Sequence, residues 1–232
     1  MNDITMLIQG NLTEDAIKFY IENYKNVPVI VSTWYETNDW ICEYNLPKNF
    51  TLIINKQPSN NVNSRAHLQI QSTLYGLTEI KTEFVIKLRG DEYYSNLEYV
   101  VNLINEYPKH ITTNSVFARK FKDFNWHVSD HLIAGLTSNL HLMFAVTDAP
   151  KNISLNPEQL LTTTFLQNKY GLDFINSTEP ETIMKENFII FDVNYLKPYK
   201  IVSNSDKKIW LNNFNNQENN CIISVEEMFY KD

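Results

Sequence analysis

The stretch ITMLIQGNLTEDAIKFYIENYKNVPVIVSTW, residues 4–34, decides the fold class of this chain. Its two ends are dense in apolar and β-branched side chains, which is typical of buried strands. Between them Asn11 precedes Glu14 by three residues, a capping box that predicts a helix through about Tyr24. The order strand, helix, strand predicts a βαβ unit with two parallel strands.

The same alternation continues as far as Pro108 and then weakens. Apolar runs and helical periodicity predict strands at 50–55, 83–88, 111–118, 131–136 and 188–193, and helices at 62–79, 97–107, from about 138, and from 157 to 170. We therefore expect an α/β fold, a single Rossmann-like α/β/α sandwich with a mostly parallel central sheet and a mixed C-terminal portion.

Composition narrows the class of protein. The 232 residues carry a net charge of −7 and are 43% apolar, which suits a packed domain and argues against broad nucleic-acid binding. The five glycines are too scattered for a dinucleotide or Walker loop, and two cysteines are too few for a structural zinc site or disulfide framework. Without a signal-like or membrane-spanning apolar run, we expect a cytoplasmic protein with no transmembrane segment.

In a parallel sheet, ligands bind beyond the carboxyl ends of the strands, which points to KLRGDEYY at 87–94. There Arg89, Gly90, Asp91 and Glu92 follow a buried strand directly. Carboxylate oxygens suit magnesium or manganese. A charged loop with an Arg–Asp surface pair is the alternative.

The helix NSRAHLQIQSTLYGL at 63–77 carries a small and polar stripe beside its apolar stripe. Arg65, Gln69, Ser72 and Gly76 form this stripe, which could line a cleft with Arg65 as an anion clamp. An ordinary amphipathic helix with a polar shoulder is the alternative.

A third segment, WHVSDHLIAGL at 126–136, combines histidines with a carboxylate. His127 and His131 are four residues apart, but no Glu lies between them, so a zinc-protease site is not indicated. Asp130 could act as a general base at the mouth of a site. Side chains that only cap a strand or helix are the alternative.

Together and in this order, these segments resemble the WavE family of lipopolysaccharide-synthesis proteins. The resemblance rests on Gln9-Gly10, Ser32-Thr33-Trp34, QIQSTLYGL at 69–77, KLRGDEYY at 87–94 and HVSDHLIAG at 127–135, and it covers roughly residues 4–147. Family members usually carry Pro where Asn11 stands and Asn-Arg directly before the Gln-Ile of the helix.

The resemblance implies a metal-dependent glycosyltransferase with a GT-A-like fold, a nucleotide-sugar donor, a glycan or lipid-linked saccharide acceptor, and manganese or magnesium. Carried onto this chain, Asp91 is the metal ligand, although Arg89 stands where a second Asp is usual, and His131 is a further candidate ligand. The resemblance also implies Asp130 as the base, if the reaction inverts the anomeric centre, and donor contacts from Gln9, Gly10, Asn11, Arg65, Gln69 and Arg89.

We expect a single domain over 1–232, with a nucleotide-sugar-binding half at 1–108 and an acceptor half with the C-terminal helices at 109–232. Two other functions remain open. A sugar nucleotidyltransferase uses a similar sheet but normally needs a Gly-rich loop, whereas Gly10 stands alone. A non-catalytic glycan-binding protein could keep the same fold and use its aromatic side chains to stack on sugars.

Overall fold

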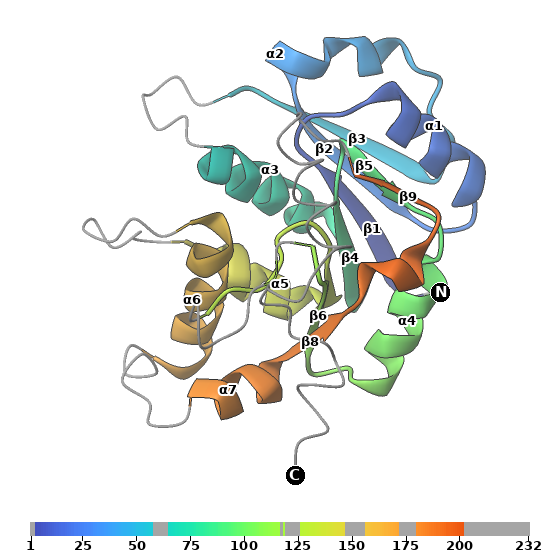
Figure 1. The fold of residues 1–232 in the computed structure, drawn as a ribbon. Coiled ribbons are helices and arrows are strands. Elements are labelled where there is room, and N and C mark those ends of the chain that lie inside the picture. Colours follow the sequence, from blue (N-terminus) through green and yellow to red (C-terminus); the bar gives the residue numbers. More distant parts are fainter. Residues whose placement is uncertain are drawn as a thin grey trace.

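A seven-stranded sheet forms the centre of the computed structural model, which describes residues 3–57, 65–116, 118, 126–146, 156–171 and 180–201. The strand order is β3-β2-β1-β4-β7-β6-β8 (Figure 1). The strands are β1 (Ile4–Gln9), β2 (Val29–Trp34), β3 (Phe50–Asn55), β4 (Phe84–Arg89), β6 (Ile111–Asn114), β7 (Ile133–Leu136) and β8 (Phe188–Phe191).

The pairing of the strands brings six carboxyl ends to one edge of the sheet. Strand β1 pairs in parallel with β2 and β4, β2 with β3, and β6 with β8, while β7 runs antiparallel to both β4 and β6. The chain therefore enters β7 at the same edge at which the other strands end. This arrangement confirms the expected α/β fold with a mostly parallel sheet and a mixed C-terminal portion.

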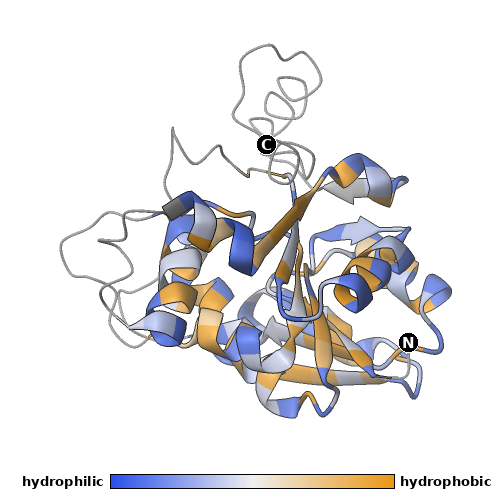
Figure 2. Cartoon of the chain, turned by 90° about the horizontal axis from the view of Figure 1, so that it is seen from below, coloured by the Kyte–Doolittle hydropathy of each residue, from blue (hydrophilic) through white to orange (hydrophobic). Residues whose placement is uncertain are grey.

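Helices cover both faces of the sheet (Figure 1). Helices α1 (Glu14–Asn23) and α4 (Leu97–Glu106) pack on one face through one apolar cluster. Helices α3 (Arg65–Glu79), α5 (Thr137–Phe144), α6 (Pro157–Tyr170) and α7 (Pro180–Asn187) contribute to a second cluster on the other face. Figure 2 shows the hydrophobic colouring concentrated on the strands and on the helix faces turned toward them. Strands buried on both faces explain the nearly continuous apolar runs in the sequence.

Shorter elements lie around the sheet. Helices α2 (Tyr35–Asn38) and η1 (Asp39–Glu43) follow β2. Strand β5 (Glu92–Tyr94) pairs with β9 (Tyr199–Ile201) in a separate two-stranded sheet, and η3 (Val193–Leu196) follows β8. None of the described helices combines the length and the apolar character needed to cross a bilayer.

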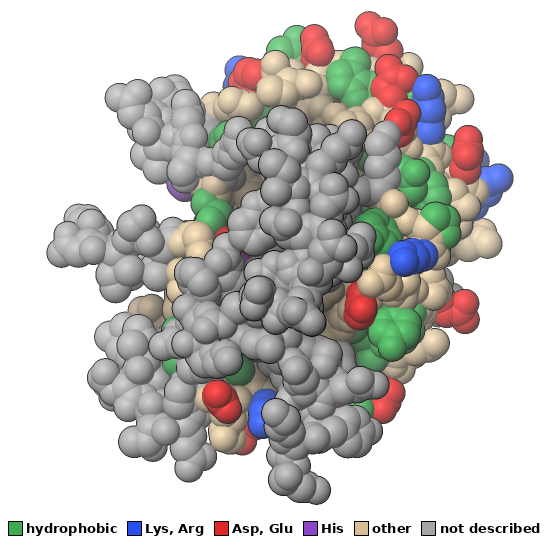
Figure 3. Space-filling model, viewed as in Figure 1, with side chains coloured by type: hydrophobic (Ala, Val, Ile, Leu, Met, Phe, Trp, Pro, Cys, Tyr) green, Lys and Arg blue, Asp and Glu red, His purple; other side chains and the backbone are tan. Residues whose placement is uncertain are grey.

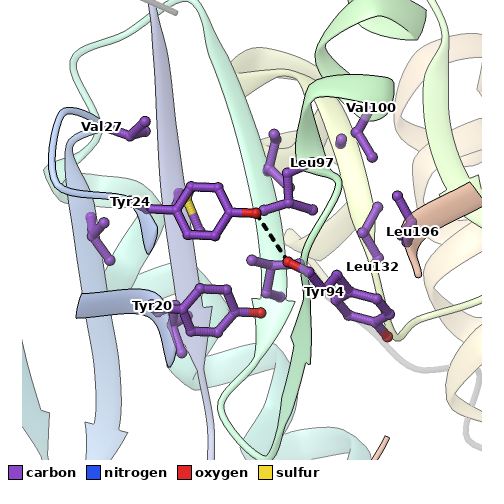
Figure 4. Packing of buried hydrophobic residues seen from close by; sticks show 14 of the residues in the cluster. Tyr20, Tyr24, Val27, Tyr94, Leu97, Val100, Leu132 and Leu196 are labelled. Carbon is purple, nitrogen blue, oxygen red and sulfur yellow. Dashed lines mark hydrogen bonds between the residues drawn. The ribbon is translucent and has the colours of Figure 1, made fainter. Parts of the chain in front are cut away.

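Tyr24 ties the end of α1 to the segment after β4 (Figure 4). Its hydroxyl donates to the backbone carbonyl oxygens of Tyr94 at 3.0 Å and Ser95 at 2.8 Å. The ring lies in the apolar cluster near Leu97 and Tyr20. This contact fixes β5, and therefore the charged residues before it, against the first helix.

The expected capping box at Asn11 is wrong. Helix α1 begins at Glu14, and its N-cap is Thr13, whose hydroxyl accepts from the Ala16 amide. The Asn11 side chain instead accepts a hydrogen bond from Thr37. The predicted start of α6 is confirmed, because Asn156 accepts from the Gln159 amide at 2.8 Å with Pro157 as the first helical residue.

Candidate active site

The segment after β4 holds an ion pair at the edge of the sheet. The Arg89 guanidinium donates to both oxygens of Asp91, from Nε to Oδ1 at 3.0 Å and from Nη2 to Oδ2 at 2.9 Å. Their side chains are 25% and 21% exposed, so the pair lies at the rim. Such bidentate pairs are among the stronger side-chain hydrogen bonds. The Arg–Asp pair left open by the sequence is therefore present.

Gly90 lets the two strand ends come close together. Its amide donates to the Gln9 carbonyl oxygen at 2.8 Å, and its carbonyl oxygen accepts from the Thr13 amide at 3.0 Å. A Cβ atom at this position would lie 2.7 Å from the carbonyl oxygen of Asn11. Only glycine fits this approach without displacing the backbone that follows β1.

Glu92 points inward, although the sequence placed it beside Asp91. Side chains alternate in an extended segment, so neighbouring carboxylates turn to opposite sides. The Glu92 side chain is fully buried, with Oε1 2.7 Å from His131 Nδ1 and Oε2 accepting from the Tyr94 hydroxyl at 2.8 Å. Arg89 Nε lies 3.4 Å from Oε1. Burial alone would raise the pKa of Glu92, but His131, Arg89 and Tyr94 outweigh it and lower the pKa to about 2.

Asp130 lies on the turn that leads into β7 and is 5% exposed. One carboxylate oxygen, Oδ1, lies 3.8 Å from His131 Nε2. Burial would raise the pKa of this carboxyl, but the charges of His131, Lys87 and Arg89 together lower it. The Asp130 carbonyl oxygen accepts from Lys87 Nζ at 2.5 Å and from Gln69 Nε2 at 3.3 Å.

A buried polar network holds this turn on β6. The Thr113 hydroxyl donates to the Ser129 carbonyl oxygen at 2.9 Å, and the Ser129 hydroxyl donates to Asn114 Oδ1 at 2.9 Å. The Asn114 amide in turn donates to the Tyr94 hydroxyl at 3.4 Å. No local pattern predicts these links, since they join residues 15 to 20 positions apart along the chain.

The three residues at the end of β1 that were predicted to contact the donor, Gln9, Gly10 and Asn11, differ in exposure. Gln9 is 4% exposed, and its Oε1 accepts from the Ser72 hydroxyl at 2.8 Å. Gly10 has a φ of +84°, and a Cβ there would meet no atom of the described residues within 4 Å. Asn11 is exposed. Gly10 and Asn11 are thus accessible to a ligand, while Gln9 lies beneath them.

Two residues of the small and polar stripe of α3, Ser72 and Gly76, pack against the sheet and do not line a cleft. Ser72 is fully buried, and a Cβ at Gly76 would lie 2.2 Å from Leu7 on β1. Gln69 reaches the Asp130 carbonyl oxygen, as described above. Arg65 is the first residue of α3, but its side chain lies outside the described residues.

The charges in this cluster are nearly balanced. Lys87 and Arg89 face three carboxylates, those of Asp91, Glu92 and Asp130. The His131 imidazole lies between two of them, Glu92 and Asp130. Over the described part of the chain, no group of three or more His, Cys, Asp and Glu side chains is arranged to hold a metal ion. On the face shown in Figure 3, acidic and basic side chains of the described residues are interspersed.

A family model described as WavE lipopolysaccharide synthesis matches residues 7–150 of the chain. This span includes the Arg89–Asp91 pair, Glu92, Asp130 and His131. No curated protein matches the chain by sequence.

Solved structures share only a general likeness with this chain. TarS from S. aureus has a TM-score of 0.44 and 14% identity over 71% of this chain and 33% of its own, and TarS 1-349 has 0.44 and 15% over 72% and 56%. HddC from Yersinia pseudotuberculosis has 0.41 and 12% over 82% and 89%. The chain thus spans about a third of the TarS structure.

Proposed function

Because the chain belongs to the WavE lipopolysaccharide synthesis family, we propose that it is a glycosyltransferase that uses a nucleotide-sugar donor. The sugar passes to a hydroxyl group of a glycan or lipid-linked saccharide. The observation that carries this proposal is the convergence of Arg89, at the end of β4, and Asp91, just after it, with Asp130 from the turn before β7. They meet at the carboxyl edge of a mostly parallel sheet, where such folds bind their ligands.

Arg89 is the residue we propose for the donor diphosphate. Its planar guanidinium can form paired hydrogen bonds with phosphate oxygens as it does with Asp91. The carboxylates of the cluster already offset its positive charges, so a diphosphate needs further positive charge to bind there. Arg65, at the start of α3, is a second candidate for this charge.

A divalent cation would supply the rest of that charge. Asp91 could hold such a cation only together with the phosphate oxygens of the donor, because magnesium beside phosphates is usually held by one or two carboxylates and by phosphate oxygens. Such an ion would neutralise negative charge on the leaving diphosphate. Both oxygens of Asp91 accept from Arg89, so a cation would compete with the guanidinium for this carboxylate.

Asp130 is the proposed base. As the acceptor oxygen forms its bond to the anomeric carbon, the bond from that carbon to the diphosphate breaks and the nucleoside diphosphate leaves with the electron pair. The hydroxyl proton passes to the Asp130 carboxylate, which the neighbouring positive charges keep ionised. His131 is poorly placed for the predicted role as a metal ligand, since its Nδ1 lies against Glu92 and its Nε2 faces Asp130.

Calorimetric titration tests the donor site. The wild-type protein is titrated with UDP, GDP, ADP, TDP and CMP, each with and without manganese, and transfer from the matching nucleotide sugars is followed by chromatography. We expect one nucleotide to bind, with Arg89→Met weakening it at least tenfold. Lys18→Met is the matched control, because Lys18 pairs with Glu14 on the exposed side of α1. Absence of binding to every nucleotide would contradict the proposal.

Two outcomes would favour the other functions. Release of pyrophosphate from a nucleoside triphosphate and a sugar phosphate would indicate a sugar nucleotidyltransferase. Glycan binding that persists in Asp91→Asn and Asp130→Asn, without any transfer by the wild type, would indicate a non-catalytic glycan-binding protein.

A further inference from the structure

Lys87 is a charged residue in the middle of the central sheet. It lies on β4 with Leu7 and Ile133 as its neighbours in register on the adjacent strands, and its exposure is 0%. Its ammonium nitrogen is 5.9 Å from the centre of the Phe144 ring on α5. Burial lowers the pKa of this amine to about 8, against the opposing effect of Asp130. A position of this kind ordinarily holds an aliphatic side chain.

The ammonium group reaches the turn that carries the proposed base. Lys87 Nζ donates to the Asp130 carbonyl oxygen from the sheet, and Gln69 donates to the same oxygen from α3. Thr113 holds the preceding carbonyl oxygen, that of Ser129, from β6. Three separate elements therefore fix the peptide units on either side of the Asp130 side chain.

The bond from Lys87 is the shorter of the two that reach this oxygen, and its donor is charged. Gln69 donates at 3.3 Å, so an apolar residue at position 87 would leave the Asp130 carbonyl oxygen with only this longer, uncharged bond. Because Lys87 is fully buried, it acts through Asp130 rather than by touching a substrate.

We propose that Lys87 is a positioning residue for the transfer reaction, which holds the Asp130 peptide in place from β4 and so fixes the position of the Asp130 carboxylate. The inference rests on the proposed function, since it assigns Lys87 to the base of that reaction. The segment KLRGDEYY would then have two roles. Arg89 and Asp91 would bind the donor at the edge of the sheet, and Lys87 would hold the peptide of the base from within the sheet.

The test compares Lys87→Met with the wild type, using the nucleotide and donor identified by the titrations above. General bases contribute about 10²- to 10⁴-fold to rate, so disturbing one through Lys87 is expected to lower kcat by about ten- to a hundredfold. The donor KM and the affinity for the nucleoside diphosphate stay within about twofold, because the rim residues are unchanged. Because removing Lys87 alone leaves the Asp130 carboxylate buried with fewer positive neighbours, kcat is compared at a temperature at which circular dichroism shows both proteins to be folded.

Two further variants complete the experiment. Lys87→Arg keeps a charged donor and is expected to recover much of the lost kcat. Lys169→Met is the matched control, because Lys169 also hydrogen-bonds a partner, Asn187, but on the α6–α7 side of the molecule; its kcat should equal that of the wild type.

The outcomes separate the possible failures. If the wild type transfers sugar and Lys87→Met does so within about threefold, the role of Lys87 is overturned while the proposed function stands. If Lys87→Met loses activity together with nucleotide affinity and melts at least 5 °C lower, or does not fold, Lys87 is a structural residue and the inference is overturned. If the wild type binds no nucleotide and transfers no sugar, the proposed function fails and the inference fails with it.

Discussion

Lys87→Met should change how the stability of the protein depends on pH. The pKa of the buried Lys87 amine falls from 10.5 to about 8 on folding, and at about 1.36 kcal/mol per pH unit the charged lysine costs roughly 3 kcal/mol of stability. This cost is fully present below pH 8, where the amine is protonated in both states. Between pH 8 and 10.5 the folded protein releases the proton and the unfolded chain keeps it, so stability rises with pH over this window.

Urea unfolding of both proteins at pH 7 and at pH 10 measures the effect. The other titrating groups cancel in the difference between the two proteins, so the stability of Lys87→Met relative to the wild type should fall by roughly 2 to 3 kcal/mol from pH 7 to pH 10. A difference that stays constant across this range would refute a charged Lys87 with a lowered pKa. A difference that grows in favour of Lys87→Met would refute the sign of the shift.

Three other changes test the remaining contacts. Asp130→Asn should lower transfer by at least about a hundredfold with nucleotide affinity retained, by kinetics and calorimetry, because it removes the proposed base but not the donor contacts. Gly90→Ala should weaken nucleotide binding and cost about 1 to 3 kcal/mol of stability in urea unfolding, since its Cβ meets the backbone of Asn11; an unchanged affinity would contradict this contact. Glu92→Gln should flatten acid unfolding between pH 4.5 and pH 2, because the lowered pKa of Glu92 gives stability that is present above pH 4.5 and lost on the way to pH 2; parallel acid curves for the two proteins would argue against it.

The order of strands and helices could be predicted from the sequence because it depends on the periodicity of apolar side chains among neighbouring residues. The strands expected at 4–9 and 83–88 are β1 (Ile4–Gln9) and β4 (Phe84–Arg89) of the structure, and the cap at Asn156 starts α6 as expected. The cap at Asn11 failed because Thr37, from another element, binds that side chain. A capping pattern cannot show such a competitor.

The candidate site was predictable only in part. The edge of the sheet follows from the βαβ order, so Arg89, Asp91 and Asp130 could be named from sequence. The direction of each side chain could not, because it depends on which residues of distant strands lie opposite. Glu92 turns inward to His131, and Asp91 turns outward to Arg89, although the two carboxylates are adjacent in sequence.

The sequence by itself determined which segments become strands and at which edge of the sheet the charged residues gather, since periodicity and chain order are properties of neighbouring residues. Only the tertiary structure decided the partners of these charges. The lysine at position 87 looks like one more polar residue in the chain, and it gains its place beneath Asp130 because β4 and β7 pair antiparallel across 46 residues, from Lys87 to Ile133. Pairings over such distances arise from packing and leave no mark in the local pattern.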